Sequence, residues 1–366
     1  MYIYQLPDWP RFKWNGPYLA GPLAAVHYHR GRLAAHVEAL DIGLRQESVL
    51  KTLTADALKT GELEGIVVDA GQVGSSVAQR LEVDVGPLKP VERRAEAIVE
   101  MVLDATRNFD KPLTTERLFA WHASLFPDGR SGSRKSTTGA WRDRGGVGAT
   151  ASFILAEGLP AFTQLPAVRL PEEMKRYLDW FNSDAAADPV VKAGIAHLGF
   201  VAIQPFDAGN GLIARAIADM ALARSESSAN RFYSMSAQIS LERSDYLSML
   251  EKTLQGTMDI TPWLDWFVGC LSRAIDGAQI TLQAVLVKGR FWQANSGVAI
   301  NERQRRVLNR FLDRGTAKIS TSQYARFTKC SHDTALRDIL PLVERGILVR
   351  NPTGGRSTSY SLGQLS

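Results

Sequence analysis

The sequence predicts a mainly α-helical protein with more than one domain. Apolar residues recur at helical spacing in most segments between Leu19 and Leu254, and this period is the main sequence signal for amphipathic helices. The pattern restarts at Asn301, where helices precede two short strand-like segments. With 366 residues, 45% of them hydrophobic, the chain is long enough to bury the cores of two or three domains.

The composition favours a protein of the cytoplasm. No run of about eighteen apolar residues occurs, and the stretch from Met1 to Trp14 has no signal-peptide core, so we expect no membrane partner. Cys270 and Cys330 are far apart and lack metal-ligand spacing. We therefore expect both to be core thiols in a reducing compartment.

The charge is distributed unevenly along the chain. Residues 301–366 carry 12 Lys or Arg and 5 Asp or Glu, a net charge of +7. The other residues carry 31 basic and 33 acidic side chains, a net charge of −2. A basic terminal module on a near-neutral body indicates a polyanionic partner for that module.

Residues 1–85 predict an N-terminal helical segment. Its aromatic cluster, which we expect to pack on the body of the protein, consists of Tyr2, Tyr4, Trp9, Phe12 and Trp14. An amphipathic helical pattern follows from Leu19 to Leu50, and Gly71 to Leu81 is typical of a connecting helix.

Residues 90–275 predict a helical core. The expected helices run over Val91 to Thr106, Thr115 to Phe126, Leu170 to Phe181, Val190 to Ile203 and Leu241 to Leu254. Ile260 to Phe267 indicates a further aromatic helix packed on this core. His122 and His197 lie within apolar patterns, so we expect them to be core histidines, and His197 could act as a base only if the geometry allowed it.

The stretch from Gln204 to Arg215 joins two of these helical patterns. Pro205 ends the first helix, and the second begins near Asn210 or Gly211 after a glycine-rich loop. Backbone N–H groups and the helix dipole favour an anion at such a start, and Arg215 lies one turn further along the helix. The loop therefore predicts an anion site, most plausibly for nucleotide phosphates. For the Gly-Asn-Gly sequence alone, a capped interhelical turn is an equal alternative.

This stretch resembles the Fic-domain motif, His-x-Phe-x-(Asp/Glu)-Gly-Asn-Gly-Arg-x-x-Arg. The matching positions are Phe206, Gly209, Asn210, Gly211 and Arg215. The departures fall on the chemistry: Gln204 replaces the catalytic His, Ala208 the acidic Mg²⁺ ligand and Leu212 the first Arg. The resemblance implies a Fic helical core with a β-hairpin flap, an N-terminal helical segment, and nucleotide binding by Gly209, Asn210, Gly211 and Arg215.

Thr60-Gly61-Glu62-Leu63-Glu64-Gly65 is similar to the inhibitory motif of that family, (Ser/Thr)-x-x-x-Glu-(Gly/Asn). The resemblance implies that Glu64 pairs with Arg215 and crowds the γ-phosphate of ATP, with Thr60 and Gly65 completing the motif. A carboxylate can occupy the fork that an arginine offers to phosphate. The alternative is that Glu62 and Glu64 are ordinary charges near a helix end.

Gly139-Ala140-Trp141-Arg142 resembles the entry to the family's flap. The two strands of the flap would be Val147 to Leu155 and Ala161 to Gln164, and its target-facing candidates are Val147, Ala149, Ser152 and Phe153. In the family this flap adds a strand to the target peptide, so the resemblance implies a target protein as partner.

The resemblance implies transfer of AMP from ATP to a Ser, Thr or Tyr hydroxyl. This reaction needs a base, a carboxylate that holds Mg²⁺, and cations on the phosphates. Gln204 has no useful basicity, Ala208 offers no metal ligand and Leu212 lacks charge. We therefore expect a degenerate site that binds ATP without a metal ligand of its own and transfers AMP weakly or not at all, or that serves another anionic substrate.

Residues 276–300 predict a connector helix, and residues 301–366 the element order of a winged helix-turn-helix. The helices expected in it are Arg303 to Asp313, Thr321 to Thr328 and His332 to Glu344. The expected strands are a short one around Ala317 to Ser320, then Ile347 to Arg350 and Thr358 to Leu362. The DNA-contact candidates are His332, Thr334 and Arg337 on the last helix and Arg350 and Arg356 on the wing. Winged helices also dock proteins or dimerise, so a homodimer and a non-catalytic regulator that binds DNA or protein stay open.

Overall fold

The described part of the chain is mainly helical and divides into two compact units, residues 1–279 and 280–366. The computed structural model describes residues 1–131, 134–143, 164–184, 187–314, 318–352 and 358–363. The boundary between the units falls within helix α12 (Thr261–Ala294). Residues 276–294 of the connector predicted over 276–300 therefore continue the helix that begins at Thr261. The finer domain boundaries near residues 85 and 300 stay predictions.

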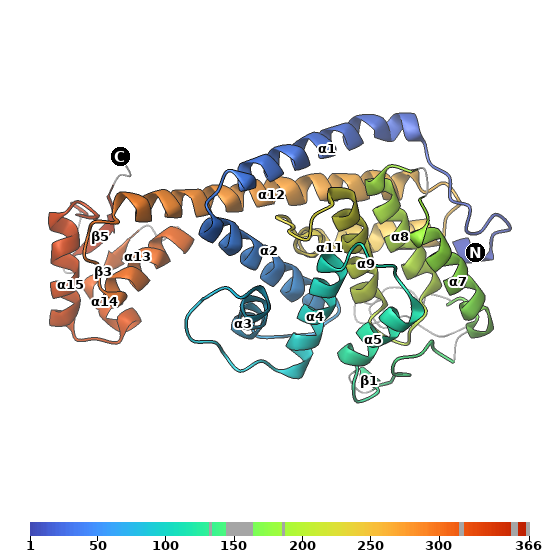
Figure 1. Ribbon diagram of the computed structural model, residues 1–366, viewed down its shortest axis with the longest axis horizontal. Coiled ribbons are helices and arrows are strands. Elements are labelled where there is room, and N and C mark those ends of the chain that lie inside the picture. Colours follow the sequence, from blue (N-terminus) through green and yellow to red (C-terminus); the bar gives the residue numbers. More distant parts are fainter. Residues whose placement is uncertain (132–133, 144–163, 185–186, 315–317, 353–357, 364–366) are drawn as a thin grey trace. The chain divides into compact units, whose positions relative to one another are not determined.

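The N-terminal part of the first unit contains three helices after a short 3₁₀ turn (Figure 1). The turn is η1 (Ile3–Gln5), and the helices are α1 (Gly16–Glu38), α2 (Ile42–Leu63) and α3 (Ala70–Leu81). The single pattern expected from Leu19 to Leu50 is thus two helices. The cause is Asp41, whose side chain accepts a hydrogen bond from the Leu44 N–H at 2.9 Å and so begins a new helix.

The middle of the first unit contains most of its core. In chain order its elements are α4 (Arg93–Arg107), α5 (Thr115–Leu125), the strand pair β1 (Arg130–Ser131) and β2 (Arg134–Lys135), η2 (Ala167–Arg169), α7 (Leu170–Asn182), α8 (Pro189–Ile203), α9 (Asn210–Glu226), α10 (Met235–Leu241) and α11 (Arg243–Leu254). Helices α8 and α9 pack on each other at the centre (Figure 1). They are buried on nearly every face, as their apolar composition requires.

Several helices surround this central pair. Helix α7 packs on α8, while α2, α4, α5 and α10 pack on α9. Helix α12 approaches α8 closely at Gly194, where an added Cβ would lie 2.9 Å from Leu264 Cδ2. The N-terminus is fixed to the unit by main-chain hydrogen bonds between Lys13 and the segment that precedes α12, Lys13 N–H to Met258 O and Ile260 N–H to Lys13 O, both 2.8 Å.

The second unit contains the elements expected from the sequence after Asn301. They are α13 (Glu302–Arg314), β3 (Ile319–Ser320), α14 (Thr321–Thr328), α15 (His332–Glu344), β4 (Leu348–Arg350) and β5 (Ser359–Leu362). The three strands form an antiparallel sheet in the order β3-β5-β4. Asp338 of α15 connects the three helices of this unit. Its carboxylate accepts from Arg303 Nε of α13 at 2.7 Å and from the Tyr324 hydroxyl of α14 at 3.2 Å.

The predicted flap falls largely outside the described residues. This applies to its strand from Val147 to Leu155 and to its target-facing candidates, which are Val147, Ala149, Ser152 and Phe153. None of the helices in the described ranges combines the length and the apolar character that a membrane span requires.

Candidate functional site

The loop between α8 and α9 has a fixed backbone shape. Gln204 ends α8 in the left-handed conformation, with φ of 48°, and Gly209 precedes α9 with φ of 75°. The Asn210 side chain closes the loop, since its Oδ1 accepts from the Phe206 N–H at 3.0 Å and its Nδ2 donates to Phe206 O at 2.7 Å. Asn210 therefore shapes the loop with its side chain rather than reaching out of it.

Two glycines at the start of α9 lie against close neighbours. A Cβ on Gly209 would lie 2.6 Å from Phe126 Cε2, and one on Gly211 would lie 2.1 Å from Glu64 Oε1. Both distances are too short for a real Cβ. The Glu64 carboxylate thus lies against the backbone at the first turn of α9, where the helix dipole favours negative charge.

Thr60 and Glu64 act together on Arg215. They are one turn apart at the end of α2, and Glu64 is its C-terminal cap residue. Arg215 Nε donates to Thr60 Oγ1 at 2.8 Å, and its Nη2 donates to Thr60 O at 3.0 Å and to Glu64 Oε1 at 3.1 Å. The two side chains of the ion pair are 3% and 9% exposed, so water screens the contact little. Gly65, with φ of 73°, follows directly.

The position of the family histidine is buried. Gln204 is 0% exposed, and its Oε1 accepts a hydrogen bond from Gln164 Nε2 at 3.1 Å. An amide oxygen can accept this bond but cannot take up a proton near neutral pH. Gln164 is the last residue of the predicted second flap strand, and its hydrogen bond to Gln204 was not indicated by the sequence pattern.

The other two departures from the family motif are also apolar and buried. Ala208 is 4% exposed and Leu212 is 0% exposed. Asp207 directly precedes Ala208, and its Oδ2 accepts from the Thr137 N–H at 2.9 Å. In the described ranges, no group of three or more His, Cys, Asp or Glu residues could hold a metal ion. The donor set at this loop therefore does not fit Mg²⁺.

Arg142 holds the backbone of the loop in place. From the sequence we expected it only at the entry to the flap. Its Nε donates to Gln204 O at 2.7 Å and its Nη2 to Leu165 O at 2.5 Å, while its N–H donates to Pro205 O at 3.0 Å. Burial lowers the pKa of Arg142 to about 10, against the charge of Asp207, which raises it. The Gly-x-Trp-Arg match was the signal that could have assigned Arg142 to this loop.

The two histidines near the site belong to the core, as expected. His122 stacks on Phe206 with ring centroids 4.2 Å apart, and burial lowers its pKa to about 4. The Nε2 atom of His197 lies 2.9 Å from the Tyr246 hydroxyl oxygen. Burial first, and then the charge of Arg215, lower the pKa of His197 to about 3. Neither ring is therefore placed as a base for the loop.

The described DNA-contact candidates of the second unit lie on α15 and at the end of β4. His332, Arg337 and Arg350 are exposed, whereas Thr334 is half-buried and its N–H donates to Ser331 Oγ at 3.1 Å. Thr334 thus takes part in the N-terminal cap of α15. Arg356 lies outside the described residues.

Comparisons with known families match two parts of the chain. Residues 112–222 match the model described as Fic/DOC family, and residues 2–83 match a domain of unknown function, DUF4172. Over 66 residues the chain is 35% identical to a protein adenylyltransferase, fic-1 of Caenorhabditis elegans. That match covers 18% of this chain and 13% of the relative's length.

Solved structures share the fold. A Fic family protein from Desulfovibrio desulfuricans superposes with a TM-score of 0.54 and 20% identity, covering 95% of this chain and 97% of that one. A Fic domain-containing signalling protein from Bacteroides thetaiotaomicron has a TM-score of 0.52 and 18% identity, covering 71% and 97%. Fic-1 from Caenorhabditis elegans has a TM-score of 0.51 and 18% identity, covering 73% and 74%.

Proposed function

We propose that this chain, whose residues 112–222 match the Fic/DOC family, is a protein AMP transferase of that family with impaired chemistry and a nucleotide site occupied by Glu64. The position of the Glu64 carboxylate is the observation that supports this most directly. It lies against Gly211 and pairs with Arg215, the two groups that would bind a phosphate at the start of α9. A bound nucleotide and Glu64 therefore compete for the same donors.

The residues at the loop explain why the chemistry is impaired. In AMP transfer, a target hydroxyl oxygen bonds to the α-phosphorus of ATP, its proton passes to a base, and pyrophosphate leaves. Gln204 cannot take the proton, and losing a positioned base costs a factor of roughly 10² to 10⁴. Leu212 supplies no charge to the phosphates, so Arg215 is the cation of this loop that remains for them.

The test is AMP transfer from radiolabelled ATP to the proteins of a cell lysate. We expect little label with the wild-type chain or Glu64→Gly. Adding Gln204→His and Ala208→Glu to Glu64→Gly restores the base and the carboxylate that holds Mg²⁺. This triple variant should raise labelling by at least about 100-fold. The matched control carries Gln164→His in place of Gln204→His, which puts a histidine beside the site but not at it. Equal labelling by both variants would contradict the proposal.

A second candidate function is DNA binding by the C-terminal unit. The supporting observation is the net charge of +7 over residues 301–366, together with the exposed side chain of Arg337 on α15. Gel retardation of a duplex over a salt series tests it. Arg337→Ala should weaken binding and reduce the slope of log K against log salt concentration by about one. Arg345→Ala, at the C-terminal end of α15, should change neither. No retardation at low salt would exclude this function.

A further inference from the structure

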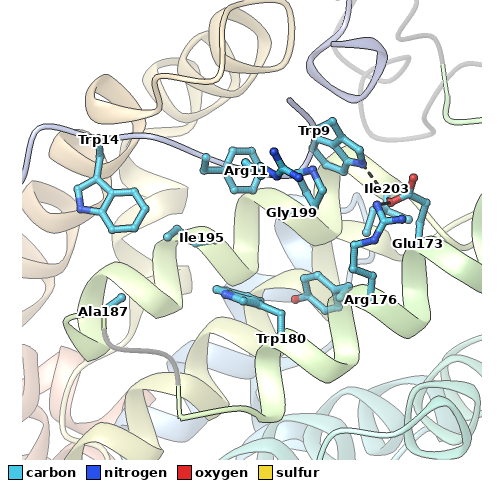
Figure 2. A pocket seen from close by; sticks show the side chains of 13 residues that line it. Trp9, Arg11, Trp14, Glu173, Arg176, Trp180, Ala187, Ile195, Gly199 and Ile203 are labelled. Atoms are coloured by element: carbon cyan, nitrogen blue, oxygen red, sulfur yellow. Dashed lines mark hydrogen bonds and ion pairs between the residues drawn. The ribbon is translucent and has the colours of Figure 1, made fainter. Parts of the chain in front are cut away.

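The first unit contains a pocket of about 460 Å³ that is separate from the loop at Gln204. The N-terminal arm covers one side of it with residues 9–12 and Trp14, and α7 and α8 form the other. In Figure 2, Trp14 and Ala187 lie at one end of the pocket, and Glu173 and Arg176 lie at the other. The volume is in the range of small-molecule sites.

The walls of the pocket are mostly aromatic. The arm contributes Trp9, Phe12 and Trp14, and α7 contributes Tyr177 and Trp180. The rings of Trp9 and Phe12 pack edge to face, with centroids 5.6 Å apart. Helix α8 supplies a floor without bulky side chains at Gly199, where an added Cβ would lie 3.3 Å from Tyr177 Cε2. Such walls suit a flat ring that can stack or pack edge to face.

The acidic side chain of the pocket already has its partners. Glu173 is 4% exposed, and its carboxylate accepts from Trp9 Nε1 at 3.0 Å, from Arg176 Nη1 at 3.2 Å and from Arg169 Nη2 at 2.5 Å. Arg176 in turn donates through Nη2 to Glu172 Oε1 at 3.2 Å. These charges neutralise one another, so they leave no demand for a cationic ligand.

Arg11 is the charged residue of the described pocket lining that is not paired in this way. It lines the pocket between Trp9 and Phe12, and its guanidinium makes no hydrogen bond or ion pair with any other residue in the described ranges. A guanidinium offers a forked pair of donors to a carboxylate or sulfonate. The charge of the pocket therefore favours an anion.

We propose that this pocket binds a small planar aromatic anion, with the ring against the tryptophans and the acidic group on Arg11. The floor of the pocket includes Ile203, the residue directly before Gln204. A bound ligand would thus contact the helix that ends at the candidate functional site. The inference does not depend on the AMP-transfer proposal, because none of the groups it uses belongs to the loop at Gln204.

Calorimetric titration of the full chain with 2-naphthoate tests the proposal, with 2-naphthalenemethanol as the uncharged ligand of the same ring size. We expect saturable binding of one naphthoate per chain and weaker binding of the alcohol. Arg11→Gln should weaken naphthoate by about threefold to tenfold, the range of a partly exposed charge contact, and leave the alcohol unchanged. Trp14→Ala, at a 37% exposed side chain, should weaken both ligands.

Lys13→Gln is the matched control, since Lys13 is an exposed cation of the same arm that pairs with Asp8 and does not line the pocket. It should change neither affinity. Absence of saturable naphthoate binding would overturn the proposal. It would also be overturned if the alcohol bound as tightly as naphthoate, or if Arg11→Gln and Lys13→Gln had equal effects.

Discussion

Glu64 Oε1 lies so close to the backbone of Gly211 that a Cβ on that glycine would be 2.1 Å away. The carboxylate at the end of α2 therefore takes the place of an anion at the start of α9. Its second contact, 3.1 Å to Arg215 Nη2, uses the cation that we propose as the phosphate-binding group. One side chain thus occupies both parts of the candidate anion site.

Gly211→Ala should lower stability because the new methyl group and Glu64 cannot both keep their positions. We expect a loss of about 1–3 kcal/mol, the usual cost of overpacking. The loss should shrink in a Glu64→Ala background, where the conflicting carboxylate is gone. Urea denaturation of the four proteins of this double-mutant cycle measures the coupling. Equal losses in both backgrounds would show that Glu64 does not lie on Gly211.

Glu64→Ala should itself destabilise the first unit, since it leaves the buried Arg215 charge without its carboxylate. Breaking such a pair costs about 3–5 kcal/mol, and the contacts of Thr60 with Arg215 reduce this loss. Glu62→Ala is the control, because Glu62 is exposed and pairs with Lys59 at the surface. Chemical denaturation at neutral pH should show a clear loss for the first variant and almost none for the second.

Arg142→Lys should also be destabilising, even though the charge is kept. The Arg142 guanidinium reaches the carbonyl oxygens of Gln204 and Leu165, and a single ammonium group cannot reproduce this fork. We expect a loss of about 2–3 kcal/mol from unsatisfied buried groups. Arg130→Lys, at an exposed residue of β1, should be nearly neutral. A similar melting temperature for both variants would contradict the assigned role of Arg142.

His122 should make the protein less stable in acid. Burial lowers its folded pKa from 6.5 to about 4, so between these values the unfolded chain binds a proton that the folded chain does not. Stability should therefore fall as the pH decreases from 6.5 towards 4. His122→Gln should remove about 1.4 kcal/mol of this loss per pH unit. Urea denaturation of both proteins at pH 7 and pH 5 compares the slopes.

The titration of Asp219 changes stability with pH in the opposite direction to His122. The effect of His122 is therefore measured as the difference between wild type and His122→Gln. Burial, and the like charge of Asp56, raise the pKa of Asp219 to about 7, while Arg231 lowers it. An acid with a raised folded pKa loses stability as the pH rises towards that value. This contribution is shared by wild type and His122→Gln, so it cancels in the difference between them.

The sequence predicted the parts of the fold that depend on local patterns. The helices expected over Thr321 to Thr328 and His332 to Glu344 have these same bounds in the structure. Each of these helices begins after a serine cap, Ser320 or Ser331, and has a helical apolar period. Both signals involve only neighbouring residues, so the sequence alone predicts them. The break at Asp41 was missed because apolar spacing continued across it, although an Asp is a typical cap residue.

The contacts of the site depend on residues far apart in the chain. Motif order suggested that Thr60, Glu64 and Arg215 belong together, and the structure places them in contact. No motif indicated that Gln164 bonds to Gln204, or that the arm closes a pocket over α7 and α8. Such contacts follow from how helices pack, and a local period carries no information about them.

The most direct test of the central claim is calorimetric titration of ATP, with Mg²⁺ and with a chelator, into wild type, Glu64→Gly and Glu62→Gly. If Glu64 competes with phosphate, Glu64→Gly should bind ATP at least about tenfold more tightly than wild type, a difference of about 1.4 kcal/mol. Glu62→Gly should behave as wild type, and Mg²⁺ should change little because Ala208 offers no ligand. Equal ATP affinity of Glu64→Gly and wild type would contradict the claim.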